Sequence, residues 1–271
     1  MDRRPIGVFD SGLGGLTALK ELRAILPGED LVYFGDTARV PYGSKGRDTI
    51  LRYARQDVAF LRTFDLKAIV IACGTVSSTA LAELSAEQDI PVFGVVGPTA
   101  IRAAQATRNN RIGIIATGAT VRTGAYERLI RHANPMAETF SRACPLFVPL
   151  VENGRTQPGD IVIETIVADY LTPMRDKGVD TLVLGCTHYP LLTEVIQNFM
   201  GPEVTLLDSG AQVVQQVRER LLVSGHQAEE NRRGVCRWFV SDSTESFVEL
   251  ASRFLGRQVT ERVAQVAIER Y

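Results

Sequence analysis

The chain has 271 residues, of which 45% are hydrophobic, so it is long enough to bury one large core or two ordinary ones. Its 30 basic and 31 acidic residues leave a formal net charge of −1, which excludes a strongly basic chain of the kind that binds nucleic acid. No run approaches the roughly 18 apolar residues of a membrane span, and no secretory apolar segment follows the first residues. We expect a cytoplasmic protein that contacts neither nucleic acid nor membranes.

Short apolar runs rich in β-branched residues alternate with amphipathic stretches along most of the chain, a pattern typical of mostly parallel sheets with helices on their faces. The sequence therefore predicts an α/β fold. In chain order, we expect strand 6–9, helix 15–26, strand 31–35, helix 48–64, strand 68–72, helix 76–87, strand 91–95, a helix opening near 97, strand 111–116, helix 120–132, an irregular stretch 133–158, helix 160–175, strands 181–185 and 204–208, helix 211–223, a charged loop 224–234, strand 236–240 and helix 244–255.

Two similar turns suggest where the chain crosses between domains. In "GVVGPTA" and "TLLDSGA" a strand ends in a glycine-containing turn and a new helix opens, near residues 97 and 208. We therefore expect a discontinuous first domain, residues 1–97 plus 209–271, and a second domain, residues 98–208. Each domain then contains one central strand that ends in a cysteine. The alternative is a single, continuous doubly wound sheet.

Cys73 and Cys186 each end an apolar run, in "IVIACGT" and "LVLGCTHYP". Ligands of open parallel sheets bind beyond the carboxyl ends of the strands, where helix N-termini also point. The positive end of a following helix should favour a thiolate relative to a free cysteine, whose pKa is about 8.5. This suits a base or a nucleophile. The alternative is a small buried hydrophobic side chain, which is our interpretation of Cys144 and Cys236.

The first predicted strand ends in "GVFDSGLGG", which places Asp10 and Ser11 at the same edge as Cys73. Backbone N–H groups around this glycine-rich turn can hold a carboxylate. The turn does not complete a GxGxxG pattern, so a dinucleotide site is not predicted. For Asp10 the alternative is a helix cap. The loop "PYGSKG", which contains Tyr42 and Gly43, offers free amides or is an ordinary turn.

His188 follows Cys186 by two residues and can assist proton transfer by its neighbour, although a structural histidine is the alternative. A metal site is not expected, because the only other histidines are His132 and His226. None of the four lysines stands conspicuously on a strand, so pyridoxal phosphate is not expected either. Glu152, taken by itself, is typical of a solvated loop carboxylate.

Two thiols that face each other across a cleft have a specific use. One thiolate can remove a proton from a carbon atom, and the other thiol can return a proton to the opposite face, which inverts that carbon. A single thiol returns the proton to the face from which it came. The sequence therefore predicts one thiolate and one thiol that exchange roles after every turnover.

Several motifs occur in an order and spacing that resemble the aspartate/glutamate racemase family, and within it the glutamate racemases, over residues 5 to 210. They are "GVFDSGLGG", "YFGDTARVPYGSK", "ACGT", "ATGATVRTGAY", "PLVENG" and "GCTHYPLL". The resemblance implies two α/β domains related by a pseudo-twofold axis, with the active site in the cleft between them. It further implies cofactor-independent interconversion of L- and D-glutamate, supply of D-glutamate for peptidoglycan, and a homodimer.

The resemblance also assigns roles. It implies that Cys73 acts on D-glutamate and Cys186 on L-glutamate, with Asp10 assisting the first, and Glu152 and His188 the second. The implied substrate-binding residues are Asp10, Ser11, Tyr42, Gly43, Gly74, Thr75, Thr117, Thr187 and His188.

One position departs from the family pattern, because Gly74 stands where an asparagine is usual. A glycine keeps the backbone N–H and leaves space for a water molecule, so we expect an asparagine to be tolerated at this position. The departure also leaves two alternatives open. One is a racemase for another small acidic amino acid, and the other is a non-catalytic, ligand-binding regulator on the same fold.

Overall fold

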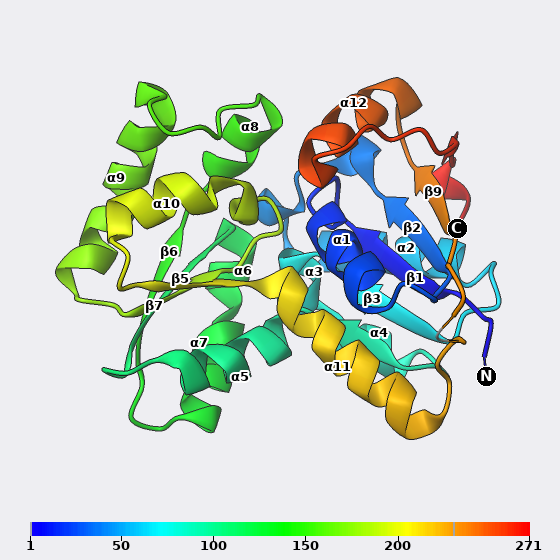
Figure 1. The fold of residues 1–271 in the computed structure, drawn as a ribbon, viewed down its shortest axis with the longest axis horizontal. Coiled ribbons are helices and arrows are strands. Elements are labelled where there is room, and N and C mark those ends of the chain that lie inside the picture. Colours follow the sequence, from blue (N-terminus) through cyan, green and yellow to red (C-terminus); the bar gives the residue numbers. More distant parts are fainter. Residues whose placement is uncertain (1, 230) are drawn as a thin grey trace.

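The computed structural model describes residues 2–229 and 231–271, and in this part of the chain it contains two separate parallel sheets (Figure 1). The larger sheet has the strand order β10 (Val263–Gln265), β9 (Cys236–Val240), β2 (Leu31–Gly35), β1 (Ile6–Asp10), β3 (Ala68–Ile71) and β4 (Val92–Gly94). The smaller sheet has the order β6 (Glu138–Ala143), β5 (Arg111–Ala116), β7 (Thr181–Leu184) and β8 (Thr205–Asp208). The predicted α/β class with two sheets is confirmed, and the alternative of one continuous sheet is wrong.

Helices cover both sheets (Figure 1). They are α1 (Leu16–Ile25), α2 (Arg47–Leu61), α3 (Gly74–Thr79), α4 (Leu81–Ala86), α5 (Val96–Ala106), α6 (Gly118–Thr123), α7 (Ala125–Ala133), α8 (Phe147–Glu152), α9 (Ile161–Asp176), α10 (Thr193–Met200), α11 (Ser209–Ser224) and α12 (Thr244–Leu255). Short 3-10 turns are found at Thr37–Arg39, Tyr42–Ser44, Tyr189–Leu192 and Ile268–Arg270. None of the helices in the described ranges is both long enough and apolar enough to cross a bilayer.

Along the chain, strands β1 to β4 of the larger sheet come first, and all four strands of the smaller sheet follow. The chain then returns to the larger sheet. Strands β9 and β10 come last in the chain and pair beside β2. Helix α11, which follows the smaller sheet, packs against both α1 and α5. The crossing points predicted near residues 97 and 208 fall in the first turn of α5 and next to the first residue of α11. As limits of folding units they stay a prediction.

The central strands are buried from end to end, which explains their continuous apolar sequences. In both β3 and β7 every residue is buried, because helices lie on both faces of a parallel sheet. Burying strands of this kind stabilises the fold by about 25 cal/mol for each Å² of apolar surface removed from water. The two strands therefore form rigid supports, and the residue that follows each one is fixed in position.

Some elements differ from those expected. The predicted irregular stretch 133–158 contains β6 and α8, and the predicted helix 76–87 is divided at Ala80 into α3 and α4. Helix α10 and strand β10 were not predicted. Strand β6 lies at an edge of its sheet, its residues are exposed or half-buried, and its sequence is mostly polar, so it lacks the apolar signal of a buried strand.

Candidate active site

A cavity of about 520 Å³ lies between the two sheets, beyond the carboxyl ends of β1, β3, β5 and β7. Helices α3 and α6 contact each other beside it, where the two halves of the molecule meet (Figure 1). Among the residues that line it are eleven predicted site residues, namely Ser11, Tyr42, Gly43, Cys73, Gly74, Thr75, Thr117, Glu152, Cys186, Thr187 and His188. The structure therefore brings together residues from distant parts of the sequence in one cavity.

Cys73 stands between β3 and α3, as the N-cap residue of that helix. Its thiol lies 3.2 Å from the hydroxyl oxygen of Ser11. Burial and the nearby carboxyl of Asp10 raise the pKa of Cys73 to about 12, although the bond to Ser11 and a backbone N–H act in the opposite direction. The expectation that the helix N-terminus favours a thiolate is therefore wrong for Cys73, because burial outweighs the dipole of a six-residue helix. Cys73 is a neutral thiol in this cavity.

Asp10 is the one predicted site residue that does not line the cavity. It is fully buried at the end of β1, where its Oδ2 accepts from the N–H of Gly12 at 2.9 Å. Its Oδ1 accepts from Thr187 Oγ1 at 3.5 Å, which joins the two halves of the site. Burial raises the pKa of Asp10, while the charge of His188 opposes this. Helix α1 has Gly15 at its N-cap position and no side-chain cap, so the alternative of Asp10 as a cap is wrong.

Cys186 follows β7 on the other sheet and belongs to a chain of three side chains. His188 Nδ1 lies 3.9 Å from Cys186 Sγ, and His188 Nε2 lies 3.0 Å from Glu152 Oε1. Burial lowers the pKa of His188, but the bonds to Cys186 and Glu152 outweigh this and raise it to about 10. At neutral pH an imidazolium therefore stands beside the Cys186 sulfur. This cation is the nearest polar neighbour of the Cys186 sulfur, whereas Cys73 has the Ser11 hydroxyl and the Asp10 carboxyl as its neighbours.

Glu152 is the last residue of α8, and its side chain is 30% exposed. Its contact with His188 shows that it is not the free loop carboxylate suggested by its local sequence. The imidazole ring also packs edge-on against Phe254 of α12, with ring centroids 5.4 Å apart. A carboxylate on one side and an aromatic ring on another fix the orientation of the histidine toward the thiol.

Threonine hydroxyls from the two halves of the molecule meet at the cavity wall. Thr75 of α3 lies 2.9 Å from Thr117, measured between the Oγ1 atoms, and Thr117 lies 3.1 Å from Thr120. Thr117 is also the N-cap of α6 and accepts from the N–H of Thr120. Thr75, Thr117 and Thr187 can each donate to a carboxylate or accept from an ammonium group, so they suit a zwitterionic ligand.

A buried ionic network fixes the wall that contains Tyr42. The hydroxyl of Tyr42 donates to Asp36 and, at 3.2 Å, to Asp57 Oδ2. Arg39 donates from Nε to Asp36 Oδ2 at 2.6 Å and from Nη2 to Asp57 Oδ1 at 2.9 Å. Burial and the charge of Asp36 raise the pKa of Asp57 well above its usual range. Because the Tyr42 hydroxyl is occupied in this network, Gly43 is the part of the turn free to face a ligand.

The glycine-rich turn after β1 serves close packing between the two halves of the site. A Cβ atom on Gly14 would lie 2.0 Å from Thr187 Oγ1 and 2.7 Å from His188 Nδ1. Only a glycine lets the turn approach these residues so closely. Gly12 alone from this cluster lines the cavity, so the turn presents fewer amides to a ligand than its sequence suggested.

Eleven further lining residues were not among the predicted site residues, and four of them differ clearly in chemistry from the polar site. Cys144, Val148 and Pro149 supply apolar surface, and Arg122 of α6 supplies a positive charge. Burial raises the pKa of Cys144, which therefore remains a thiol and fits the interpretation of bulk. Arg122 lies five residues after Thr117 in a helix too short to show a periodic pattern, so no pattern distinguished it from an ordinary surface arginine.

In residues 2–229 and 231–271, the structure contains no group of three or more histidine, cysteine or acidic side chains arranged to hold a metal ion. The His188, Cys186 and Glu152 chain instead links one thiol to one carboxylate through an imidazole, which is an arrangement for moving and holding protons.

The site and the fold can be compared with known proteins. Residues 16–217 match the Asp/Glu/Hydantoin racemase family. The chain belongs to this family. A glutamate racemase of Geobacter metallireducens is 46% identical over 269 residues, which cover 99% of this chain and 98% of the relative. Family membership and the predicted isomerase are thus confirmed.

Solved structures of glutamate racemases agree with the two-sheet fold of this family member. The structure of a glutamate racemase isoform from Bacillus anthracis superposes with a TM-score of 0.93, at 35% identity and with 98% of both chains covered. That of the Francisella tularensis enzyme in complex with D-glutamate superposes with a TM-score of 0.92, at 36% identity and with all of both chains covered.

Proposed function

We propose that this racemase interconverts L- and D-glutamate through two thiols, without a cofactor. The observation that carries the proposal is that Cys73 and Cys186 follow the central strands of two different sheets and line the same cavity. The names of the relatives support glutamate as the substrate. The different surroundings of the two thiols support the assignment of one as a base and the other as an acid.

The proposed reaction starts with L-glutamate and a Cys186 thiolate that is paired with the His188 imidazolium. The thiolate takes the α-proton, and the electron pair of the broken C–H bond moves into the α-carboxylate. The neutral Cys73 thiol then donates its proton to the opposite face of the carbon. D-glutamate leaves, and the enzyme is left with a Cys73 thiolate and a Cys186 thiol. Reaction with D-glutamate reverses these steps.

The polar residues of the cavity hold the substrate in this proposal. Hydroxyl and amide groups at Ser11, Gly43, Thr75, Thr117 and Thr187 bind the ammonium and the two carboxylates. They stabilise the charge that develops on the α-carboxylate as the proton leaves. Asp10 does not line the cavity and acts indirectly. It accepts a hydrogen bond from Thr187, and its carboxyl raises the pKa of the Cys73 thiol.

Gly74 favours a second candidate, a racemase for another small acidic amino acid. An asparagine side chain, usual in the family, is missing at a residue that lines the cavity. The lost amide changes the hydrogen bonds open to an α-carboxylate or an ammonium group, and it therefore bears on substrate choice. Aspartate is the first alternative to test.

The test is incubation of the purified protein with L-glutamate in deuterated water. We expect loss of optical activity, formation of D-glutamate and deuterium at the α-carbon of the product, because the thiol that returns the proton has exchanged with solvent. The same assay with L-aspartate gives the second kcat/KM value. If the protein turned over aspartate and not glutamate, aspartate would be its substrate. If neither amino acid exchanged its α-proton for deuterium, the non-catalytic regulator would be favoured.

The biological setting belongs to the same proposal. D-glutamate made by this reaction would be used in peptidoglycan synthesis. The homodimer and the cytoplasmic location expected from the sequence stay predictions, which size-exclusion chromatography with light scattering and cell fractionation can test.

A further inference from the structure

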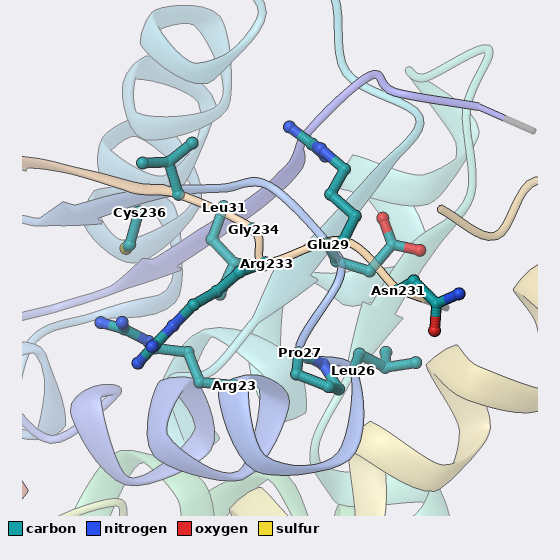
Figure 2. Close-up of a pocket in the computed structure, with 11 residues that line it drawn as sticks. Arg23, Leu26, Pro27, Glu29, Leu31, Asn231, Arg233, Gly234 and Cys236 are labelled. Atoms are coloured by element: carbon teal, nitrogen blue, oxygen red, sulfur yellow. The ribbon is translucent and has the colours of Figure 1, made fainter. Parts of the chain in front are cut away.

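A second cavity, of about 390 Å³, shares no lining residue with the candidate active site. The last turn of α1, the turn that leads into β2 and the segment that leads into β9 enclose it (Figure 2). Its lining residues include three arginines, Arg23, Arg232 and Arg233, next to the apolar side chains of Leu26 and Leu31. The reaction proposed above makes no use of these residues.

Hydrogen bonds between distant segments hold the walls of this cavity in place. Gly234 donates from its N–H to the carbonyl of Pro27 at 2.8 Å, and Leu31 donates to the carbonyl of Val235 at 2.8 Å. A Cβ atom on Gly234 would lie 1.9 Å from the carbonyl oxygen of Glu29, so the two segments are in backbone contact. The cavity is therefore preformed, and binding does not have to order its walls.

Two acidic residues next to the cavity, Glu29 and Asp30, are already paired. Glu29 is buried and paired with Lys67, whose side chain is fully buried. Asp30 pairs with Arg232 and also accepts from the N–H of Val235 at 2.8 Å. Neither carboxylate is available to neutralise a further arginine.

In the described residues, the guanidinium groups at this cavity outnumber the carboxylates that pair with them. Arg23 shares its partner Glu261 with Arg257. Arg233 is exposed, and within residues 2–229 and 231–271 no carboxylate pairs with it. Figure 2 shows the Arg23 and Arg233 side chains extending toward the same end of the cavity. Two like charges brought together in this way repel each other unless an anion lies between them.

We propose that this cavity binds a small phosphorylated metabolite, with its phosphate group held by Arg23 and Arg233. Planar guanidinium groups bind phosphate oxygens through paired N–H donors, which gives both charge compensation and orientation. The volume is that of a small-molecule site, and the apolar surface of Leu26 and Leu31 accommodates the part of the ligand that bears the phosphate. This site is separate from the racemase reaction and does not depend on it.

Isothermal titration calorimetry on the full chain tests the proposal. The probes are inorganic phosphate, pyrophosphate and glucose 6-phosphate, with sodium chloride at matched ionic strength as the blank. We expect saturable binding of at least one phosphate compound, weakened about tenfold or more in Arg233→Gln and in Arg23→Gln. Tight binding of inorganic phosphate would identify the free ion as sufficient, and binding of glucose 6-phosphate alone would identify an ester.

Arg131→Gln is the matched control, because Arg131 is an exposed arginine on α7, away from the cavity. It removes the same charge and should bind the probes like the native protein. Circular dichroism verifies that all variants are folded. The proposal is overturned by equal binding in native protein and Arg233→Gln, by equal weakening in Arg131→Gln, or by the absence of binding for all three probes. Racemase activity is measured in parallel, in the absence of the phosphate probes. It should be the same in Arg23→Gln and Arg233→Gln as in the native protein.

Discussion

The backbone of Gly74 lies against the carbonyl oxygen of Gly185, so closely that a Cβ atom on Gly74 would be 2.5 Å from that oxygen. These two residues are the immediate neighbours of Cys73 and Cys186. The start of α3 and the end of β7 are therefore in backbone contact at the base of the cavity. The contact fixes how near the two thiol-bearing segments come to each other.

This contact reverses the expectation for Gly74→Asn. A side chain at this position has to push against a backbone carbonyl, which cannot move aside as a flexible side chain can. We expect the variant to lose about 1–3 kcal/mol of unfolding free energy and to have a lower kcat/KM for glutamate. Urea denaturation and steady-state kinetics measure the two effects.

Gly97→Ala is the control for this substitution, because apart from its chain neighbours a Cβ atom there meets nothing within 4 Å and the residue lies inside α5. It should leave activity unchanged and change the free energy of unfolding by less than about 1 kcal/mol, since the higher helix propensity of alanine is opposed by its position before Pro98. If Gly74→Asn were as stable as the native protein and more active, the family asparagine would fit this backbone after all.

The two thiols should make separable contributions. In Cys73→Ser and in Cys186→Ser, racemisation should fall by about 10²- to 10⁴-fold, the range of a lost acid or base. Serine is a far weaker acid than cysteine, so it cannot serve as the anion. In deuterated water, Cys73→Ser should still exchange the α-proton of L-glutamate slowly, whereas Cys186→Ser should not. Proton NMR of the α-position measures this exchange.

Cys236→Ser provides the comparison for the thiol variants, because Cys236 lies outside the candidate active site and its pKa is raised to about 12, mainly by burial. It should racemise glutamate at the native rate. Equal exchange of both enantiomers in Cys73→Ser would contradict the assignment of one thiol to each face of the substrate.

His188 gives a prediction for pH dependence. Its pKa is raised from 6.5 to about 10, so the folded state holds a proton that the unfolded state releases at lower pH. The stabilisation from this proton is fully present below pH 6.5 and is lost as the pH rises through about 10. In Glu152→Gln the carboxylate that supports the imidazolium is gone, so the pKa of His188 should fall. Nitrogen-15 NMR of the His188 ring follows this titration directly.

The same variant should show where the imidazolium matters for catalysis. We expect the alkaline limb of the profile of kcat/KM against pH to move to lower pH in Glu152→Gln, because Cys186 loses its charged partner earlier. His132→Gln serves as a control, since His132 is exposed on α7. An unchanged titration of His188 in Glu152→Gln would show that the hydrogen bond between them does not set its charge.

Asp57 should separate positioning of the substrate from chemistry. Asp57→Asn keeps the size of the native side chain and an oxygen that can accept from Tyr42, so it should largely keep the network around Tyr42. Asp57→Ala removes one of the two buried carboxyls that hold Arg39 and Tyr42, leaving only Asp36, and should destabilise the protein by about 1–3 kcal/mol. As the turn at Gly43 shifts, KM should rise more than kcat falls. A matching loss of kcat in both variants would argue against a positioning role.

The central strands and the two cysteines were predictable because buried parallel strands have continuous apolar sequences and end where ligands bind. The role of Glu152 was implied only by the family resemblance, because the residue ends α8, a six-residue helix with a proline, which has no periodic pattern to detect. The state of Cys73 was predicted wrongly, since a helix terminus is visible in sequence and the depth of burial is not. The Arg39 and Asp57 network was missed for the same reason.

The order in which the sheets are built has a consequence for synthesis on the ribosome. Strand β2 needs β9 as its second neighbour, with Leu31 beside Cys236, but β9 leaves the ribosome only after the whole of the smaller sheet has been made. Until then β2 is an open edge that another nascent chain can pair with. The smaller sheet, whose strands follow one another closely, is complete earlier. We therefore expect aggregation in cells to begin from chains that stop or pause between residues 208 and 236, and truncation before β9 to yield insoluble protein.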